Sequence, residues 1–338
     1  PFVSEEVKFE LVQPPQAETV RQQLEESEFL SLTIDMDDTL FYFTGKEKGT
    51  VYIRKGLPEL LNCIKCLSFI NITILSNLPS EFVAGLYLSV NEIRGFEREK
   101  IIGRSLFFMR KSAQKPLAKS SRASLLVDDT FLNWRGFSKT DSPLTEDNFL
   151  FSKRFLSADS LPKEREKPFS LYDIALRGKY LRLVTEVCLC PAQGGRFIQC
   201  RCVAEPQLVH LKNSLQSVVE EHVRLKQRFK ESYFLWDCRR IVRARREAIL
   251  KGHSCALLVE SPEVKTLAET LVLRMGGQLE NKNLGENLYI LDDLDENLIK
   301  QIDRAFLAGK KVFRLAFIFD AFFNLGANFT DPAYLIKL

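Results

Sequence analysis

Three apolar runs along this chain stop in the same way, each at an acidic or hydroxyl side chain. They are residues 29–34 (FLSLTI) before Asp35, residues 70–75 (INITIL) before Ser76, and residues 123–127 (ASLLV) before Asp128 and Asp129. Stretches of helical character, such as residues 57–67 (LPELLNCIKCL), lie between them. Continuous apolar strands that are separated by helices are typical of a parallel sheet covered on both faces. The pattern therefore predicts an α/β domain.

The polar ends of these runs should lie close together. Parallel strands place their carboxyl ends at one edge of the sheet, and ligands bind beyond that edge. The first run continues as DMDD over residues 35–38, so Asp37 joins Asp35 there, and the third run brings Asp128 and Asp129. We expect these four carboxylates to share one site.

Carboxylates gathered in this way need a positive partner. Two of them about 5 Å apart repel each other by roughly 3 kcal/mol at an effective dielectric constant of about 20. A hard divalent cation relieves this repulsion. We expect Mg²⁺, which proteins usually bind through one or two carboxylates, water and a substrate phosphate. Aspartates at strand ends also form turns and helix caps. The clustering of four favours a magnesium site.

The chain divides into five expected segments. They are a helical lead-in over residues 1–28, the parallel-sheet core over 29–164, an insert over 165–205, a long helical connector over 206–252 and a compact α/β module over 253–338. The insert contains EVCLC-PAQGG-RFIQCRC, the pattern of a hairpin around a glycine-rich turn. The connector is strongly charged, and residues 207–250 contain neither proline nor glycine.

Composition limits the class of protein. Of the 338 residues, 45% are hydrophobic and 27% charged, which is enough apolar material for sizeable cores. Lys and Arg outnumber Asp and Glu by 48 to 44, and the resulting charge of +4 gives no reason to expect direct nucleic-acid binding. Apolar stretches fall short of the ~20 residues of a membrane helix, and the first residues lack the pattern of a signal peptide. We expect a soluble intracellular protein without membrane contact.

The order of polar groups along the chain resembles the haloacid dehalogenase superfamily of phosphoryl-transfer enzymes. That superfamily has Asp-x-Asp-x-Thr after its first strand, a hydroxyl after the second, a downstream Lys, and paired Asp after the third. The matching residues are Asp35, Asp37, Thr39, Ser76, Lys115, Asp128 and Asp129. The resemblance implies a Rossmann-like catalytic domain of the haloacid dehalogenase type.

The resemblance also implies a role for each matching residue. Asp35 would attack phosphorus and form an aspartyl-phosphate, and Asp37 would act as the general acid and then the general base. Asp35, Asp128 and the backbone carbonyl of Asp37 would hold Mg²⁺, with Asp129 acting through a water molecule. Lys115 and Ser76 would contact the phosphoryl oxygens. The residues assigned to substrate binding are Thr39, Arg54, Ser76 and Lys115.

Within this superfamily, residues 29–138 are similar to the phosphatases of the RNA polymerase II carboxy-terminal domain, of the transcription-factor-IIF-associating type. That family shows IDD-x-x-x-x-W, Q-K-x-L and VKLRPG elements, and this chain has VDDTFLNW at 127–134, QKPL at 114–117 and VYIRKGLPELL at 51–61. The likeness implies a Mg²⁺-dependent phosphatase for phosphoserine or phosphothreonine of the polymerase tail. It also implies a nuclear location and contact with the transcription machinery.

The C-terminal module resembles a BRCT domain, which the same phosphatase family carries after its catalytic domain. The likeness rests on the order strand, helix, Gly276-Gly277, strand, helix, short strand, helix, and on ILKGHSCALLVE before the first strand. BRCT modules usually place a Trp in the last helix, whereas FIFDAFF puts Phe317 near that position. Such a module either docks a partner protein or serves only as a packing unit.

Cys188, Cys190, Cys200 and Cys202 form a C-x-C-x₉-C-x-C pattern on the predicted hairpin. Alternation along a strand places both members of each pair on one face, so four thiolates can converge on a tetrahedral Zn²⁺. Two alternatives remain open. Small buried cysteines are common on strand faces, or the hairpin, which is not part of the family's pattern, guards the substrate groove.

The connector carries a basic run made of Arg239, Arg240, Arg243, Arg245 and Arg246. It forms either a solvated helix face or a surface that attracts a phosphorylated tail or nucleic acid.

Two further functions stay open beside the polymerase-tail phosphatase. One is a catalytically silent scaffold whose modules dock phosphoproteins. The other is a phosphatase of the same superfamily that acts on a small metabolite, a nucleotide or a nucleic-acid end, because superfamily membership fixes the chemistry better than the substrate.

Overall fold

The structure is a computed structural model, which describes residues 30–44, 49–67, 70–76, 80–91, 93, 101–102, 121–129, 145–157, 180–191, 197–203, 207–230, 232–279, 287–293 and 311–336. The expected helix over residues 1–28, the QKPL motif with Lys115, and Trp134 lie outside these ranges. The described helices include none with both the length and the apolar character that a membrane crossing requires.

A five-stranded parallel sheet forms the centre of the first half of the chain, in the order β5-β4-β1-β6-β7. Its strands are β1 (Leu30–Asp35), β4 (Ile70–Leu75), β5 (Ile101–Ile102), β6 (Ser124–Asp128) and β7 (Phe149–Phe151). The three strands that the apolar runs predict are therefore confirmed. In the register, Asp35 lies opposite Leu75 and Ile34 lies opposite Val127, so the carboxyl ends of β4, β1 and β6 are level with one another.

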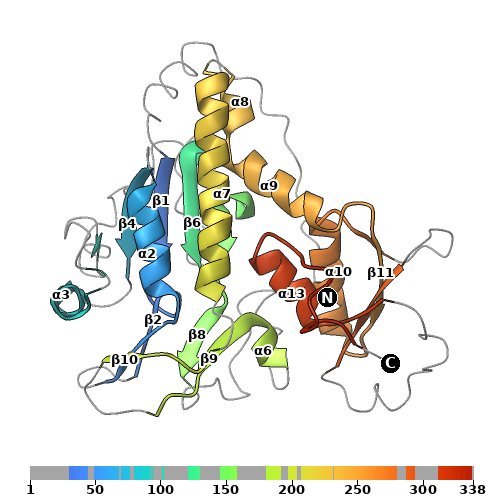
Figure 1. Cartoon of the computed structure of the whole chain (residues 1–338), viewed down its shortest axis with the longest axis horizontal. Helices are drawn as coiled ribbons and strands as arrows, with labels where there is room; N and C mark the ends of the chain where they lie inside the picture. The colour runs from blue at the N-terminus through green and yellow to red at the C-terminus, as the bar shows by residue number, and fades with distance from the viewer. Residues whose placement is uncertain are drawn as a thin grey trace, which may run out of the picture.

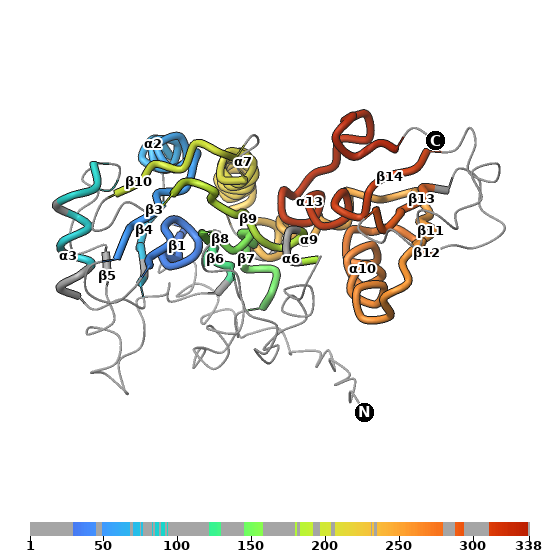
Figure 2. The backbone as a smooth tube through the Cα atoms, turned by 90° about the horizontal axis from the view of Figure 1, so that it is seen from below, coloured from blue at the N-terminus to red at the C-terminus, as the bar shows by residue number. Residues whose placement is uncertain are grey.

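Helices α2 (Leu57–Cys66) and α7 (Gln207–Arg228) lie side by side on one face of this sheet (Figure 1, Figure 2). Helix α2 buries Leu57, Leu60, Leu61 and Ile64, which have the spacing of a single helix face. Full burial of one such side chain contributes about 1.5–3 kcal/mol, so this face fixes the helix against the sheet. Helix α3 (Ser80–Ser89) lies near the β5 edge.

The expected single connecting helix is three helices: α7, α8 (Tyr233–Trp236) and α9 (Cys238–Ile249). Asp237 separates the last two, because its side chain accepts a hydrogen bond from the backbone N–H of Arg239 and caps α9. Helix α7 is also more than a connector. Its buried side chains join the core under the five-stranded sheet; they include Leu208, Leu211, Leu215, Val218 and Val219.

Two smaller sheets flank the carboxyl end of the central sheet. The first contains β2 (Phe41–Phe43) and β3 (Val51–Ile53), which are antiparallel, and β10 (Phe197–Gln199), which is parallel to β3. The second contains two parallel strands, β8 (Arg154–Ser157) and β9 (Thr185–Cys188). Helix α6 (Leu181–Val184) leads directly into β9. The prediction that β9 and β10 pair as a hairpin is wrong, because each strand adds to the edge of a different sheet.

The C-terminal module is built on a four-stranded parallel sheet in the order β12-β11-β13-β14. Its elements are β11 (Ser254–Leu258), α10 (Pro262–Arg274), β12 (Gln278–Leu279), β13 (Asn287–Leu291), β14 (Val312–Arg314) and α13 (Ala316–Phe323). Phe317 is buried in its core, with its ring 4.6 Å from that of Phe313. This confirms that the module is α/β, as predicted, and that an aromatic side chain fills the position near Phe317.

Helix α9 joins the two halves (Figure 1), and the edge strand β7 packs against the C-terminal module through the same core. The ring of Phe151 in β7 stacks on Phe322 of α13 at 5.9 Å, and the Arg246 guanidinium lies 5.4 Å and 5.0 Å from these two rings. An ion pair between Lys153 and Asp320 adds to this contact. The aromatic side chains therefore form one continuous core across the junction.

The basic run on α9 is used largely inside the molecule. Arg243 pairs with Asp147 in the short 3₁₀ helix η4 (Glu146–Asn148), and Arg246 donates to the backbone carbonyls of Glu146 and Phe149. Arg239 pairs with Asp237. The expectation of a solvated helix face holds in part, because Arg240 and Arg243 are exposed. The remaining contacts are internal, and those of Arg243 and Arg246 hold α9 against the segment that leads into β7. A second 3₁₀ helix, η2 (Ser121–Ala123), leads into β6.

Candidate active site

The site begins with the loop that follows β1. The backbone N–H groups of Leu40 and Phe41 both donate to the carbonyl of Met36, at 3.0 and 3.1 Å, and close a tight turn. Asp38 adopts a left-handed backbone conformation within it, with φ 57°. Asp accepts this conformation more readily than most residues, because its short polar side chain can bond locally. The turn directs the chain away from the strand immediately after Asp35.

Three carboxylates converge at the carboxyl ends of β1 and β6. One oxygen from each of Asp35, Asp128 and Asp129 lies within 4.8 Å of the other two. Asp35 and Asp128 are the last residues of neighbouring strands, and both are buried, with exposed fractions of 7% and 1%. The prediction that separate segments bring these aspartates together is confirmed.

The electrostatics of this cluster call for a cation. Burial, followed by the charges of Asp128, Asp37 and Asp129, raises the pKa of Asp35 well above its usual range. The Thr39 hydroxyl acts in the opposite direction on that pKa, yet its buried oxygen makes no hydrogen bond of ordinary geometry. Hard oxygen ligands, mutual repulsion and an unsatisfied hydroxyl together fit a hard divalent cation such as Mg²⁺ with a phosphate beside it.

Asp37 occupies a different position from these three carboxylates. Its two oxygens accept hydrogen bonds from the Ser76 hydroxyl, at 3.0 and 3.1 Å. Ser76 follows β4, so the second strand end also reaches the site, as expected. The contact itself differs from the expectation, because Ser76 holds the Asp37 carboxylate, whereas the sequence resemblance assigns it to the phosphoryl oxygens.

Arg154, at the start of β8, is a site residue that the sequence does not indicate. Its Nε donates to Asp129 at 2.5 Å. Arg154 also counters the rise in the pKa of Asp38, which burial, then Asp129, and then Asp37 raise to about 7. One guanidinium therefore balances part of the negative charge on the outer side of the cluster.

Arg54, assigned to substrate binding from the sequence, lies inside the protein. Its side chain is 0% exposed, and it pairs with Glu186 through Nε at 3.0 Å. Its Nη1 donates to the backbone carbonyl of Thr39 at 2.9 Å and to the Ser152 hydroxyl at 2.7 Å. These contacts favour a positioning role, because the guanidinium is committed to the loop that carries the aspartates.

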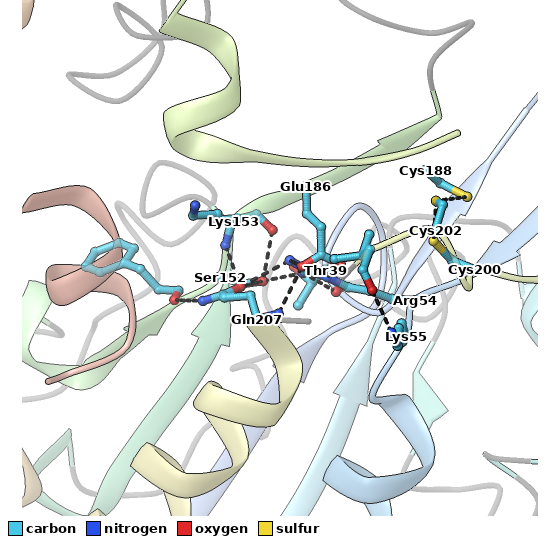
Figure 3. Close-up of polar contacts among 12 residues, drawn as sticks. Thr39, Arg54, Lys55, Ser152, Lys153, Glu186, Cys188, Cys200, Cys202 and Gln207 are labelled. Carbon is cyan, nitrogen blue, oxygen red and sulfur yellow. Dashed lines mark hydrogen bonds and ion pairs between the residues drawn. The ribbon is translucent and has the colours of Figure 1, made fainter. Parts of the chain in front are cut away.

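The partners of Arg54 come from four distant parts of the chain (Figure 3). Glu186 lies in β9, and its Oε2 also accepts the backbone N–H of Gln207, the first residue of α7. The side-chain oxygen of Gln207 accepts from Arg54 at 3.1 Å and from the backbone N–H of Lys153 at 2.9 Å. This network links the active-site loop, β9, α7 and the end of β7.

The four cysteines of the insert also converge. One Sγ from each of Cys188, Cys190, Cys200 and Cys202 lies within 4.8 Å of the others, although β9 and β10 do not pair. Burial raises the pKa of Cys200 to about 11. Burial also acts to raise the pKa of Cys202, but the N–H of Leu189 and the neighbouring thiols lower it overall. The thiols therefore differ in their readiness to lose a proton.

Two solved structures share this fold over nearly the whole chain. A variant of the fission yeast RNA polymerase II CTD phosphatase Fcp1, bound to beryllium fluoride, is 13% identical, with a TM-score of 0.52 over 95% of this chain and 99% of that chain. A second structure, of Fcp1 as an essential RNA polymerase II CTD phosphatase, is 12% identical, with a TM-score of 0.50 over 92% and 97%. At such identity the likeness shows the fold alone, which matches the expected haloacid-dehalogenase-like architecture. Neither a family model nor a curated protein matches the sequence.

Proposed function

We propose that this protein is a Mg²⁺-dependent phosphatase that works through an aspartyl-phosphate. The observation that carries the proposal is that the acidic side chains have two kinds of partner. Asp35, Asp128 and Asp129 converge within 4.8 Å, while Asp37, whose charge also acts on Asp35, accepts hydrogen bonds from the Ser76 hydroxyl. A nucleophile beside a cation site and a separate acid–base group are the two parts that this mechanism requires.

In the first step, an Asp35 carboxylate oxygen forms a bond to phosphorus, and the bond from phosphorus to the substrate oxygen breaks. The electron pair goes to the leaving oxygen, which takes a proton from Asp37. In the second step, Asp37 accepts a proton from water, whose oxygen attacks phosphorus and breaks its bond to Asp35. The turn after β1 places Asp37 two residues beyond the nucleophile, and Ser76 fixes its carboxylate.

Asp35, Asp128 and Asp129, with the backbone carbonyl of Asp37, would hold Mg²⁺. When bound, this ion supplies the positive charge that stabilises the acidic cluster and the developing charge on the phosphoryl group. Thr39 lies beside Asp35, where its unsatisfied hydroxyl is suited to contact a phosphoryl oxygen. Lys115, which the sequence assigns to the same task, lies outside the described residues and stays a prediction.

The proposed substrate is phosphoserine or phosphothreonine in the flexible tail of RNA polymerase II. The motifs that resemble polymerase-tail phosphatases support this, as does a shared fold over 95% of the chain with a CTD phosphatase. We propose that the C-terminal module is a BRCT domain that docks the transcription machinery in the nucleus. Docking by a tethered module raises the local concentration of the tail, so the affinity need not come from contacts at the phosphate.

Hydrolysis of p-nitrophenyl phosphate by an Asp35→Asn variant tests the mechanism. We expect at least a 1,000-fold loss, because removal of an essential catalytic side chain costs about 10⁴- to 10⁶-fold in well-studied hydrolases. Asp293→Asn, a change in the C-terminal module, is the matched control and should retain full activity. Undiminished turnover by Asp35→Asn would overturn the nucleophile assignment. Stabilisation of the parent chain by beryllofluoride with Mg²⁺ is an independent check.

A substrate panel tests the proposed specificity. We expect kcat/KM to be highest for phosphorylated tail peptides and far lower for sugar phosphates, nucleotides and nucleic-acid ends. The reverse order would identify a phosphatase for small molecules or nucleic-acid ends. If the chain hydrolyses nothing and neither Mg²⁺ nor beryllofluoride changes its melting temperature, it is a docking scaffold.

A further inference from the structure

We propose that Cys188, Cys190, Cys200 and Cys202 form a structural Zn²⁺ site. In a tetrahedral ZnS₄ centre with Zn–S bonds of about 2.3 Å, neighbouring sulfurs are about 3.8 Å apart. Here the Sγ atoms of Cys200 and Cys202 are 3.4 Å apart and those of Cys202 and Cys188 are 4.0 Å apart. The observed spacings lie on either side of the ideal value, so a single ion fits among the four sulfurs with only small shifts.

The exposure of these cysteines is unlike that of cysteines that serve only for packing. Cys188 and Cys200 are buried beside Tyr52 and Phe155, but Cys190 is only partly buried and Cys202 is exposed. A free cysteine that acts as a small apolar residue is usually fully buried. Two buried and two accessible thiols form instead a site that is fixed on the inside and open to a metal ion from the outside.

Neighbouring backbone groups support a charged thiolate cluster. The N–H of Leu189 donates to Cys202 Sγ at 3.1 Å, which is the kind of outer contact that orients a metal ligand. One residue beyond Cys202, the carbonyl of Val203 accepts a hydrogen bond from the Lys55 ammonium at 2.6 Å. Four sulfur ligands in tetrahedral geometry select zinc, or iron as the alternative, over Mg²⁺.

The ion would join two sheets that have no strand pairing with each other. Cys188 is the last residue of β9, which pairs with β8. Cys200 follows β10, which pairs with β3, and the Cys200 N–H extends this pairing by donating to the Ile53 carbonyl at 2.9 Å. The pairing of β9 with β10 that the sequence suggests is absent between these described strands. A metal ion supplies the missing link.

The cysteine cluster lies beside Arg54 and its partners, which lead to the candidate active site (Figure 3). Strand β3 leads directly to Arg54, which bonds Glu186 of β9 and the Thr39 carbonyl of the aspartate loop. Strand β8 begins at Arg154, the partner of Asp129. Zinc would thus stabilise both arms that position the acidic cluster. This consequence for activity rests on the proposed phosphatase function, whereas zinc binding itself does not.

Metal analysis of the full chain, purified from zinc-replete medium under reducing conditions, tests the proposal without any substrate. We expect one zinc per chain, and release of that zinc by an organomercurial in step with modification of the four thiols. Cobalt exchanged into the site should give a thiolate-to-metal charge-transfer band and the strong visible bands of tetrahedral coordination. Less than a tenth of one zinc per chain, stoichiometric iron, or disulfides between these cysteines would overturn the proposal.

Variants locate the site. Cys202→Ser removes the exposed ligand, and Cys66→Ser, an exposed cysteine on α2, is the matched control. We expect Cys202→Ser to lose zinc affinity by more than the roughly 10- to 100-fold that outer-shell changes cost, and Cys66→Ser to bind zinc normally. With Mg²⁺ in excess, zinc removal should lower the melting temperature of the parent chain and of Cys66→Ser, but not that of Cys202→Ser. Equal zinc content in both variants would refute the assignment. If Cys202→Ser does not fold, the metal content and cobalt spectrum of the parent chain decide.

The zinc site and the phosphatase function can fail separately. An inactive chain that binds one zinc would contradict the phosphatase function and leave the zinc site intact.

Discussion

The Ser76 hydroxyl donates to both carboxylate oxygens of Asp37, at 3.0 and 3.1 Å, across the gap between β4 and the loop after β1. This geometry links Ser76 to proton transfer. If Asp37 protonates the leaving group, a change at Ser76 should matter most for substrates whose leaving group needs a proton.

We therefore expect Ser76→Ala to lower kcat/KM on a phosphoserine peptide by about 10- to 100-fold, at the lower end of general acid–base catalysis or below it. We compare kcat/KM because it reports the formation of the aspartyl-phosphate and not its hydrolysis, which is the same for every substrate. The loss on p-nitrophenyl phosphate should be much smaller, because p-nitrophenolate leaves without a proton. Ser76→Thr keeps the hydroxyl and should recover most of the peptide activity. Equal losses on both substrates, accompanied by a rise in KM, would instead assign Ser76 to the phosphoryl oxygens.

The contacts of Arg54 lead to a second prediction. Removing one partner from a buried ion pair costs about 3–5 kcal/mol, because the other charge stays buried without compensation. Arg54→Met should lower the free energy of unfolding by this amount in urea titrations. Arg54→Lys keeps a charge but loses the planar fork that reaches Glu186 and Thr39, so it should be intermediate.

The kinetic consequence separates positioning from substrate binding at Arg54. A positioning residue acts on the geometry of the aspartate loop, so Arg54→Lys should lower kcat and leave the KM for a phosphopeptide within about twofold. Arg240→Lys, on the exposed side of α9, is the matched control and should change neither quantity. A raised KM with an unchanged kcat would restore Arg54 to the substrate.

The strands and the acidic cluster could be predicted because their signals are local. A continuous apolar run is itself the sign of a buried parallel strand, and the residue that follows the run marks the strand end. Asp35 and Asp128 therefore meet through one rule of sheet geometry. No long-range information was needed to predict that the strands ending at Asp35 and Asp128 reach a common site, whereas the direct pairing of β1 with β6 is known from the structure.

The surroundings of Arg54 and the pairing of β10 depend on contacts that no local pattern encodes. Arg54 is bonded to Ser152 and Gln207, which are 98 and 153 positions away. Strand β10 extends the β3 edge, although glycine-rich sequence close to β9 favoured a hairpin. The break between α8 and α9 had a weak signal, because Asp237 is a good helix cap, but the absence of proline and glycine concealed it.

The joint between α9 and the C-terminal module offers a prediction about stability. Gly276 has φ +76°, and a Cβ added there would lie 1.9 Å from the Glu247 carbonyl oxygen of α9. Gly252 has a similar φ of +82° with no atom within 4 Å of such a Cβ. Gly252→Ala should thus cost only the left-handed strain of about 1–2 kcal/mol.

Gly276→Ala adds a clash with backbone to the same strain and should cost clearly more than Gly252→Ala. We expect its melting temperature to fall well below that of the Gly252 variant in calorimetry of the full chain. The clash should also weaken the hydrogen bond from the Leu250 N–H to the Met275 carbonyl, now 2.8 Å, which hydrogen exchange at Leu250 would detect. Equal melting temperatures for the two variants would show that the approach of α9 to this glycine is looser than observed.

The pH dependence of stability should have a contribution from His222 on α7. Its Nδ1 lies 2.6 Å from the Trp236 carbonyl, which can only accept, so Nδ1 carries the proton and the buried Nε2 has no hydrogen-bond partner among the described residues. Burial, with Lys226 adding to it, lowers the pKa of His222 to about 4. Because the unfolded chain binds this proton more readily, the stabilisation is complete above a pH of about 6.5 and is lost as the pH falls toward 4. The free energy of unfolding should be lower at pH 4 than at pH 6.5 by an amount on the order of 3 kcal/mol from this group. Urea titrations between these pH values should show a shallower slope for His222→Gln than for the parent chain. Identical slopes for His222→Gln and the parent would mean that His222 takes up its proton over the same pH range in the folded and the unfolded chain.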